Sequence, residues 1–213
     1  MDSRRIHKPS INEISIKGKR SEKLAIFDLD DTLIISQAKI QVIDPKSGRV
    51  LKSLTPEQFN HYVHDHNHAL SFTEFEDAEI LRRSTFITEI LEKLLNFYTS
   101  GVHVSIVTAR SNTKLIRDFF LEKGINIHPD LVFAVNDPRY NFKGNVAEKK
   151  KQAIHGLIEY GYKDLVFFDD NDDNLRLAKE IEKEKDVKVE TVKVGWNYIG
   201  RDPMQKIKDY GKT

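Results

Sequence analysis

A short apolar run near the start of the chain ends in two aspartates that stand two residues apart. Residues 24–27 have the composition of a buried strand, and Asp28 and Asp30 follow directly. Side chains at positions i and i+2 of an extended backbone point to the same side, so both carboxylates are expected to leave the strand end together. Open α/β proteins bind their ligands at this end of their strands. The spacing therefore favours a site over a plain acidic loop if other strands end in matching groups.

Two later strand-like runs also end in polar residues. Residues 102–107 are rich in β-branched side chains and lead into 108–110, a Thr-Ala-Arg run, while residues 165–168 lead into the aspartate pair 169–170. A helical stretch that opens with residues 148–151 lies between them. The repeated order of apolar strand, polar tip and helix predicts an α/β fold with a Rossmann-like, mostly parallel sheet and helices on both faces.

The groups at these strand ends suit phosphoryl transfer. An aspartate can attack phosphorus, threonine and lysine can hold phosphate oxygens, and further carboxylates can hold a hard cation. In chain order, segments 28–33, 106–108, 149–151 and 167–174 resemble the four signature motifs of phosphatases of the haloacid dehalogenase (HAD) superfamily. The resemblance runs from about residue 24 to 194, and it implies a small cap inserted after the first strand.

The resemblance implies roles for the first motif. Asp28 is expected to be the nucleophile that forms an aspartyl-phosphate, with a cation and a lysine neutralising the approaching phosphate. Asp30 is expected to protonate the leaving oxygen and then to activate water, and its backbone carbonyl would ligate the metal. Asp31 stands where the family often has glycine, and we expect it to cap the following turn.

Thr108 and Ala109 of the second motif are expected to bind the phosphate of the substrate, while the place of Arg110 stays open between a phosphate contact and a surface salt bridge. The third motif leaves residues 149–151, all lysines, as candidates. Lys150 is favoured as the phosphate-binding lysine because apolar residues follow it at i+4 and i+8 on the face predicted to be buried.

Magnesium is the expected cofactor, because every candidate ligand offers oxygen. The metal site is predicted to consist of Asp28, Asp30, Asp169 and Asp170. The resemblance implies that Asp170, of the last two, is the direct ligand. Asn174 stands where a related form of the fourth motif has a second aspartate, so one charge is missing there.

Composition narrows the class of protein. The 213 residues include 34 basic and 33 acidic side chains, a net charge of +1 that argues against strong overall attraction to nucleic acid or membranes. The absence of cysteine excludes disulfides and thiolate chemistry. No apolar stretch approaches the roughly 18 residues of a membrane span. We expect a cytoplasmic protein with no membrane association, and no obligate protein partner is implied.

The pattern along the chain divides it into four parts. Residues 1–23 form a basic extension, residues 24–35 and 85–200 form the HAD-like core, residues 36–84 form the cap insertion, and residues 201–213 form a C-terminal tail. A solvated extension is favoured over a nucleic-acid-binding arm for the basic N-terminus.

Within the insertion, alternating runs at 39–43 and 49–54 flank turn residues and predict a hairpin. Thr55 and the following proline predict a short helix through residue 63, and residues 71–77 are open between strand and loop. The first core helix is predicted over residues 85–98.

Four of the eight histidines, His61, His64, His66 and His68, fall within eight residues of the cap. Alternating histidines can supply two or three zinc ligands, although a polar loop or contacts with a phosphorylated substrate are the favoured interpretation.

Together these observations predict a magnesium-dependent phosphomonoesterase. The doubled aspartate of the fourth motif is similar to that of polynucleotide 3′-phosphatases, nucleotidases and acid-phosphatase-like branches. A phosphorylated small molecule, nucleotide or nucleic-acid end is therefore the expected substrate. A regulatory protein that only binds phosphorylated ligands and a phosphotransferase are the alternatives.

Overall fold

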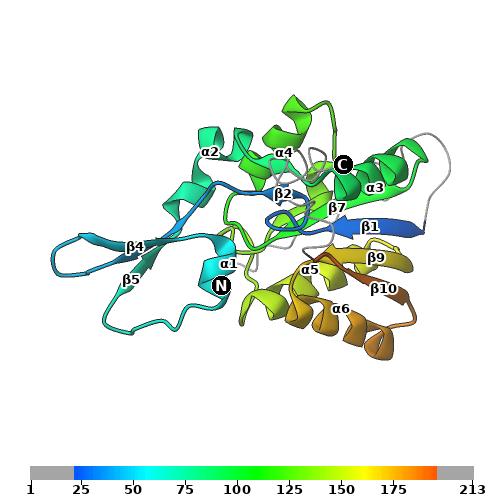
Figure 1. Ribbon diagram of the computed structural model, residues 1–213. Helices are drawn as coiled ribbons and strands as arrows, with labels where there is room; N and C mark the ends of the chain where they lie inside the picture. Colours follow the sequence, from blue (N-terminus) through cyan, green and yellow to red (C-terminus); the bar gives the residue numbers. More distant parts are fainter. Residues whose placement is uncertain (1–21, 196–213) are drawn as a thin grey trace, which may run out of the picture.

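A five-stranded sheet runs through the centre of the protein in the computed structural model, which describes residues 22–195 (Figure 1). All neighbouring strands are parallel. Their order across the sheet is β10 (Lys188–Lys193), β9 (Asp164–Asp169), β1 (Lys23–Phe27), β7 (His103–Thr108) and β8 (Val132–Ala134). The predicted α/β fold is confirmed. The predicted tail 201–213 and nearly all of the basic extension 1–23 lie outside the described residues.

Helices cover both faces of this sheet, as predicted. Figure 1 shows α3 (Thr88–Thr99) and α4 (Thr113–Glu122) on one face and α5 (Val146–Glu159) and α6 (Asp172–Glu184) on the other. Two crossovers lead from β1 to β7 and β8, and the chain then returns to β9 on the other side of β1. The order of strands reverses between β1 and β9, and open α/β folds bind ligands at such a point.

The core strands are apolar throughout because helices cover them on both sides. All six residues of β7 are buried, as are the last five of β9. Asparagine caps the N-terminus of three core helices: Asn112 on α4, Asn145 on α5 and Asn171 on α6. Each side-chain oxygen accepts backbone N–H groups that the first helical turn leaves unpaired. These caps fix where three helices begin at the site-bearing edge of the sheet.

The predicted start of the first core helix was wrong. Residues Thr85–Phe86 form strand β6, which pairs with β2 (Ile34–Ile35), and α3 begins at Thr88. The apolar residues Phe86 and Ile87 are compatible with a strand and with the first turn of a helix, so the local sequence does not distinguish these two structures. The β2–β6 ribbon lies where the chain leaves the core and returns to it.

The segment between β2 and β6 contains a small antiparallel sheet of order β4-β3-β5, which extends to one side of the core (Figure 1). The predicted hairpin is confirmed, and the predicted short helix forms but ends at Asn60 instead of residue 63. Strand β5 was not predicted, and residues 73–76 form a 3₁₀ turn. We call this segment the cap; its elements are β3 (Ile40–Ile43), β4 (Val50–Leu54), α1 (Pro56–Asn60), β5 (Ala69–Ser71), η1 (Thr73–Glu76) and α2 (Ala78–Arg82). The core adds a further turn, η2 (Pro129–Leu131).

Within residues 22–195 we find no helix with the length and apolar character needed to cross a membrane.

Candidate active site

The register of the parallel strands brings the predicted first and fourth motifs together. Phe27 of β1 pairs with Phe168 of β9, so Asp28 and Asp169 follow side by side at the edge of the sheet. The backbone N–H of Asp28 donates to the carbonyl of Phe168 at 2.9 Å. The backbone pairing alone therefore sets the relative positions of the two aspartates.

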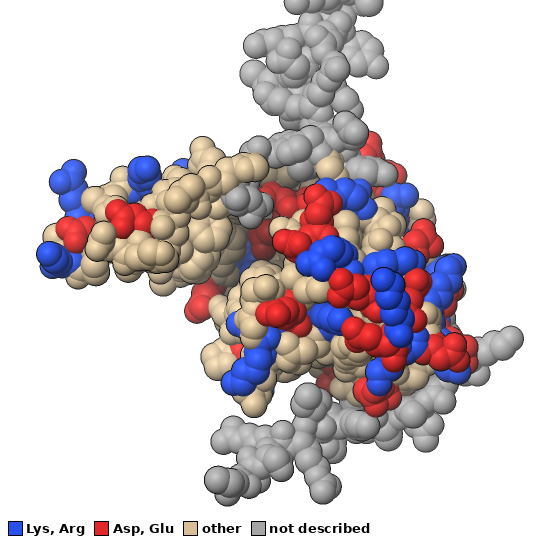
Figure 2. Space-filling model, turned by 90° about the horizontal axis from the view of Figure 1, so that it is seen from below, with Lys and Arg blue, Asp and Glu red and all other residues tan. Residues whose placement is uncertain are grey.

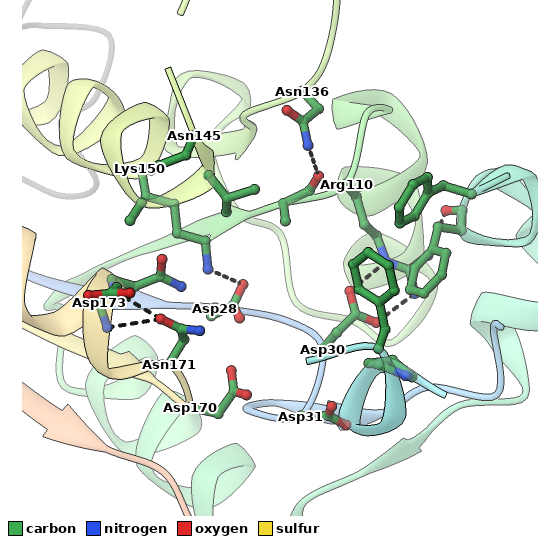
Figure 3. A pocket seen from close by; sticks show the side chains of 18 of the residues that line it. Asp28, Asp30, Asp31, Arg110, Asn136, Asn145, Lys150, Asp170, Asn171 and Asp173 are labelled. Atoms are coloured by element: carbon green, nitrogen blue, oxygen red, sulfur yellow. Dashed lines mark hydrogen bonds and ion pairs between the residues drawn. The ribbon is translucent and has the colours of Figure 1, made fainter. Parts of the chain in front are cut away.

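Lys150 forms ion pairs with both of these aspartates, and Figure 3 shows its side chain directed at Asp28. Lys150 is 1 % exposed, and its Nζ lies 2.9 Å from Asp28 Oδ1 and 2.8 Å from Asp169 Oδ2. The neighbouring lysines point elsewhere: Lys149 donates to Asn136, and Lys151 pairs with Glu184. Of the three candidate lysines, only Lys150 reaches Asp28.

Burial dominates the electrostatics of this pair. It raises the pKa of Asp28 well above its usual value; Lys150 opposes this rise, and the carboxylates of Asp169 and Asp170 add to it. Burial alone would lower the pKa of Lys150, but Asp169 and Asp28 outweigh it and raise that pKa. Asp28 Oδ1 makes an ion pair with the lysine, yet no described donor is directed at it as a hydrogen bond.

Asp169 has both carboxylate oxygens engaged. Oδ1 accepts from the backbone of Asn171 at 2.8 Å, and Nδ2 of Asn174 lies 2.9 and 3.1 Å from the two oxygens. With Lys150 on Oδ2, the group is held from three directions. The amide of Asn174 therefore orients Asp169, where a second aspartate would have repelled it.

Asp170 completes a group of carboxylates that could hold a cation. Asp28, Asp169 and Asp170 each offer an oxygen, and these oxygens lie within 4.8 Å of one another. Burial and the charge of Asp169 raise the pKa of Asp170 to about 6. Crowded carboxylates with raised pKa values and oxygen-only ligands fit a hard divalent cation such as Mg²⁺. The side chain of Asp30 is not part of this group.

Asp30 is instead held by Arg110, as Figure 3 shows. Nε of Arg110 donates to Oδ2 at 2.9 Å and Nη2 donates to Oδ1 at 2.8 Å, a two-pronged ion pair. The guanidinium also donates to the carbonyl of Phe75 at 2.7 Å and to the hydroxyl of Ser36 at 3.2 Å. Arg110 is only 4 % exposed, so the surface salt bridge considered from the sequence is wrong.

The turn between Asp30 and β2 depends on the backbone of Asp31. This residue has a φ of +56°, and its N–H donates to the carbonyl of Ile34 at 2.8 Å. Aspartate is among the few residues other than glycine that adopt this left-handed conformation readily. The turn therefore requires a residue at position 31 that tolerates a left-handed backbone, and aspartate meets this requirement.

Thr108 ends β7 and is fully buried, and its hydroxyl accepts from the backbone N–H of Arg110 at 3.3 Å. It does not line the cavity described below, whereas Ala109 does. The carbonyl of Ala109 accepts from Asn136 at 2.6 Å, which ties the second-motif loop to the loop after β8.

A cavity of about 890 Å³ opens above these groups. Its floor includes Asp28, Asp30, Lys150 and Asp170, which come from the core, and its other wall comes from the cap. The core residues of the cavity could be predicted from their positions at strand ends. A cap over the site was expected, but the pairing of Arg110 with Asp30 and the cap residues that line the cavity were not predicted, because neither has a local signal.

The cap histidines do not converge. His64 Nε2 lies 3.0 Å from the carbonyl of His68, and the ring of His66 packs edge-on against that of His64. Among the described residues, the only group of three or more potential metal ligands is the aspartate cluster. The structure therefore offers no support for a zinc site in the cap.

No protein-family model matches this chain, and a comparison with curated protein sequences found no match. The candidate site therefore rests on the positions and chemistry of its own residues.

Proposed function

We propose that the protein is a magnesium-dependent phosphomonoesterase that works through an aspartyl-phosphate on Asp28. The observation that carries the proposal is the buried contact of Asp28 with Lys150 at 2.9 Å, beside two further carboxylates at the switch point of the sheet. A purely structural ion pair needs no cavity above it, but this one lines an open cavity of about 890 Å³.

In the first half of the reaction, an oxygen of Asp28 attacks phosphorus while the bond from phosphorus to the leaving oxygen breaks. Lys150 offsets the negative charge that gathers on the phosphate oxygens. Asp30 gives a proton to the leaving oxygen, which departs as an alcohol or phenol. Asp30 must turn one oxygen away from Arg110 for this step, because Arg110 holds both of them.

In the second half, Asp30 takes a proton from water, and the water oxygen attacks the aspartyl-phosphate. The bond between Asp28 and phosphorus breaks, which releases inorganic phosphate and restores the carboxylate. Mg²⁺, held by Asp28 and Asp170 with Asp169 nearby, would neutralise phosphate charge when bound. Of the two second-motif residues expected to bind phosphate, Ala109 lines the cavity and Thr108 does not.

The proposal is tested by hydrolysis of an aryl phosphate with Mg²⁺, with EDTA, and with the variant Asp28→Asn. We expect metal-dependent hydrolysis that falls by about three orders of magnitude or more in the variant, because the nucleophile is lost. Asp186→Asn, which changes an exposed aspartate outside the cavity, is the matched control and should retain full activity.

Equal hydrolysis by wild type and Asp28→Asn would contradict the mechanism. Absence of hydrolysis for every phosphomonoester, together with ligand binding, would favour the regulatory alternative. Transfer of phosphate to added glycerol in preference to water would favour a phosphotransferase.

A further inference from the structure

Aromatic rings from the cap form the wall of the cavity opposite the carboxylates. Phe59 and Phe72 pack edge-to-face with centroids 5.6 Å apart, and Phe72 lies 6.3 Å from Phe75. The guanidinium carbon (Cζ) of Arg110 in turn lies 5.1 Å from the centroid of the Phe75 ring. All three rings line the cavity. We call Phe59, Phe72 and Phe75 the aromatic wall.

Part of the apolar surface of the aromatic wall is exposed. Phe72 is 47 % exposed, although phenylalanine is among the residues most often buried. Its open surface belongs to a cavity whose floor binds phosphate in the proposed function, and Ile40 and Pro56 add further apolar lining. An occupant held at the floor by its phosphate would therefore place its leaving group beside this wall.

The charges of the cavity limit what that leaving group can carry. Acidic side chains outnumber basic ones, with Asp28, Asp30, Asp31, Glu76, Asp170 and Asp173 against Arg110, Lys150 and Arg176. Each of the three cations already has an acidic partner: Asp30 for Arg110, Asp28 and Asp169 for Lys150, and Asp173 and Glu180 for Arg176. The described lining thus has no unpaired cation for a second phosphate.

The described surface over the neighbouring helices α5 and α6 also lacks a cluster of cations that could bind further phosphates. Over α5 and α6, basic and acidic side chains are interspersed on the described part of the face seen in Figure 2. Several of them form ion pairs, such as Lys151 with Glu184 and Lys179 with Glu182. Nucleic acids bind where cations gather along a stripe or groove, and this face lacks that arrangement among its described residues.

We infer that the substrate is a small monophosphate whose uncharged leaving group carries a planar aromatic ring, as in a nucleoside monophosphate, and not a nucleoside diphosphate or an oligonucleotide end. The inference rests on the proposed function for the phosphate position. The ring stacks on the aromatic wall, and the cavity of about 890 Å³ suits a ligand of this size.

Adenosine 5′-monophosphate and ribose 5-phosphate provide a matched test, since they share the leaving oxygen and differ in the base. We expect kcat/KM to be at least about tenfold higher for the nucleotide, the size of effect typical of base–aromatic stacking. Adenosine diphosphate and a 3′-phosphorylated oligonucleotide should be poorer substrates than the monophosphate.

The variant Phe72→Ala should reduce the ratio of the two kcat/KM values toward one, mainly through KM, and Phe72→Trp should restore it. Leu51→Ala removes a comparably exposed apolar side chain of the cap outside the cavity and should leave the ratio unchanged. These variants separate a stacking role from general loosening of the cap.

Binding to Asp28→Asn, measured by calorimetry with Mg²⁺, separates this inference from the proposed function. Equal binding and equal hydrolysis of both phosphates would overturn the aromatic specificity while leaving the phosphatase intact. Preferential nucleotide binding that depends on Phe72, without any hydrolysis by wild type, would support the aromatic site and refute the phosphatase. Strong hydrolysis of the oligonucleotide phosphate would also overturn the inference.

Discussion

The core wall and the cap wall of the cavity differ in burial and in the contacts that hold their side chains. The core wall consists of Asp28, Asp30, Lys150 and Asp170, and Lys150 is buried there in ion pairs with Asp28 and Asp169. On the cap wall, Phe59 and Phe72 are held by ring contacts and remain partly exposed. The proposed chemistry thus sits on a rigid sheet edge, and the proposed selectivity sits on a small element with little core of its own.

The cap sheet shows why this division is physically reasonable. Four of the five residues of β4 are exposed, and the buried positions of β3 are Ile40 and Val42. A three-stranded sheet with one apolar face is at the lower limit of independent stability. Arg110 joins the two walls because it contacts Asp30 in the core and the Phe75 carbonyl in the cap.

The largest expected effect tests the core wall. Replacing Lys150 with Met leaves two buried carboxylates without their cation, and we expect a loss of about 3–5 kcal/mol in the free energy of unfolding, measured with urea. Lys151→Met is the control, since its ion pairs with Glu180 and Glu184 are near the surface and should contribute less than about 1 kcal/mol. Equal losses would remove the distinction between a structured core site and an ordinary helix face.

The second prediction concerns Arg110, which links the core wall to the cap wall. Lysine cannot reproduce the four hydrogen bonds of Arg110, so Arg110→Lys should cost about 2–3 kcal/mol and lower kcat about a hundredfold. Limited proteolysis should show faster cleavage in the cap than in the core.

Arg139→Lys is the matched control for Arg110→Lys. Arg139 donates to both carboxylate oxygens of Asp137, as Arg110 does to Asp30, but the side chain of Arg139 is largely exposed. We expect less than about 1 kcal/mol of destabilisation and unchanged cap proteolysis. If Arg110→Lys behaves in the same way, the cap is not held through Arg110.

A third prediction uses Mg²⁺ and pH to probe the core wall alone. At a tenfold excess over its Kd, Mg²⁺ should stabilise the protein by about 1.4 kcal/mol, measured as a rise in Tm. The pKa of Asp170 is raised from 3.8 to about 6, so protons compete with the metal and the Tm rise should disappear as the pH falls through about 6.

Without metal, Asp170 makes the stability of the protein depend on pH with the opposite sign to a carboxylate whose pKa is lowered by folding. The folded protein binds the Asp170 proton more tightly than the unfolded chain does, so metal-free stability should increase as the pH falls from about 7 toward 4. Asp170→Asn should reduce both effects. A Tm rise with Mg²⁺ that is independent of pH would place the metal elsewhere.

The smallest effect asks whether the two walls unfold together. Gly48 in the cap hairpin and Gly101 after α3 both have positive φ, and an added Cβ would contact nothing within 4 Å. Alanine at either position should therefore cost only backbone strain, about 1 kcal/mol. We expect Gly101→Ala to lower global stability and Gly48→Ala to speed amide exchange in β3 and β4 alone. An equal global loss from both variants would show that cap and core form one cooperative unit.

Much of the core site could be predicted because it follows from local pattern. Apolar runs located β1, β7 and β9, and the residue after each run fixed which side chains reach the sheet edge. Helical periodicity also favoured Lys150 over its neighbours, since Ile154 lies one turn further on the same buried face. The sequence was less informative for β6, whose two residues also fit the start of a helix.

The cap wall could not be predicted in the same way. Phe59, Phe72 and Phe75 lie on three different elements or loops, with no common period, and β5 is only three residues long. Arg110 meets Asp30 from 80 residues away, so neither residue carries a local sign of the other.

The amino-acid sequence by itself determined the parallel α/β core, the strand-end positions of its carboxylates and the helix that carries Lys150. These features depend on side-chain alternation, apolar runs and helical spacing, which act over a few residues. Only the tertiary structure decided that Lys150 bridges Asp28 and Asp169, that Arg110 holds Asp30, and that aromatic rings face the carboxylates. Those contacts join distant segments, and they form only when the core and cap pack around one cavity.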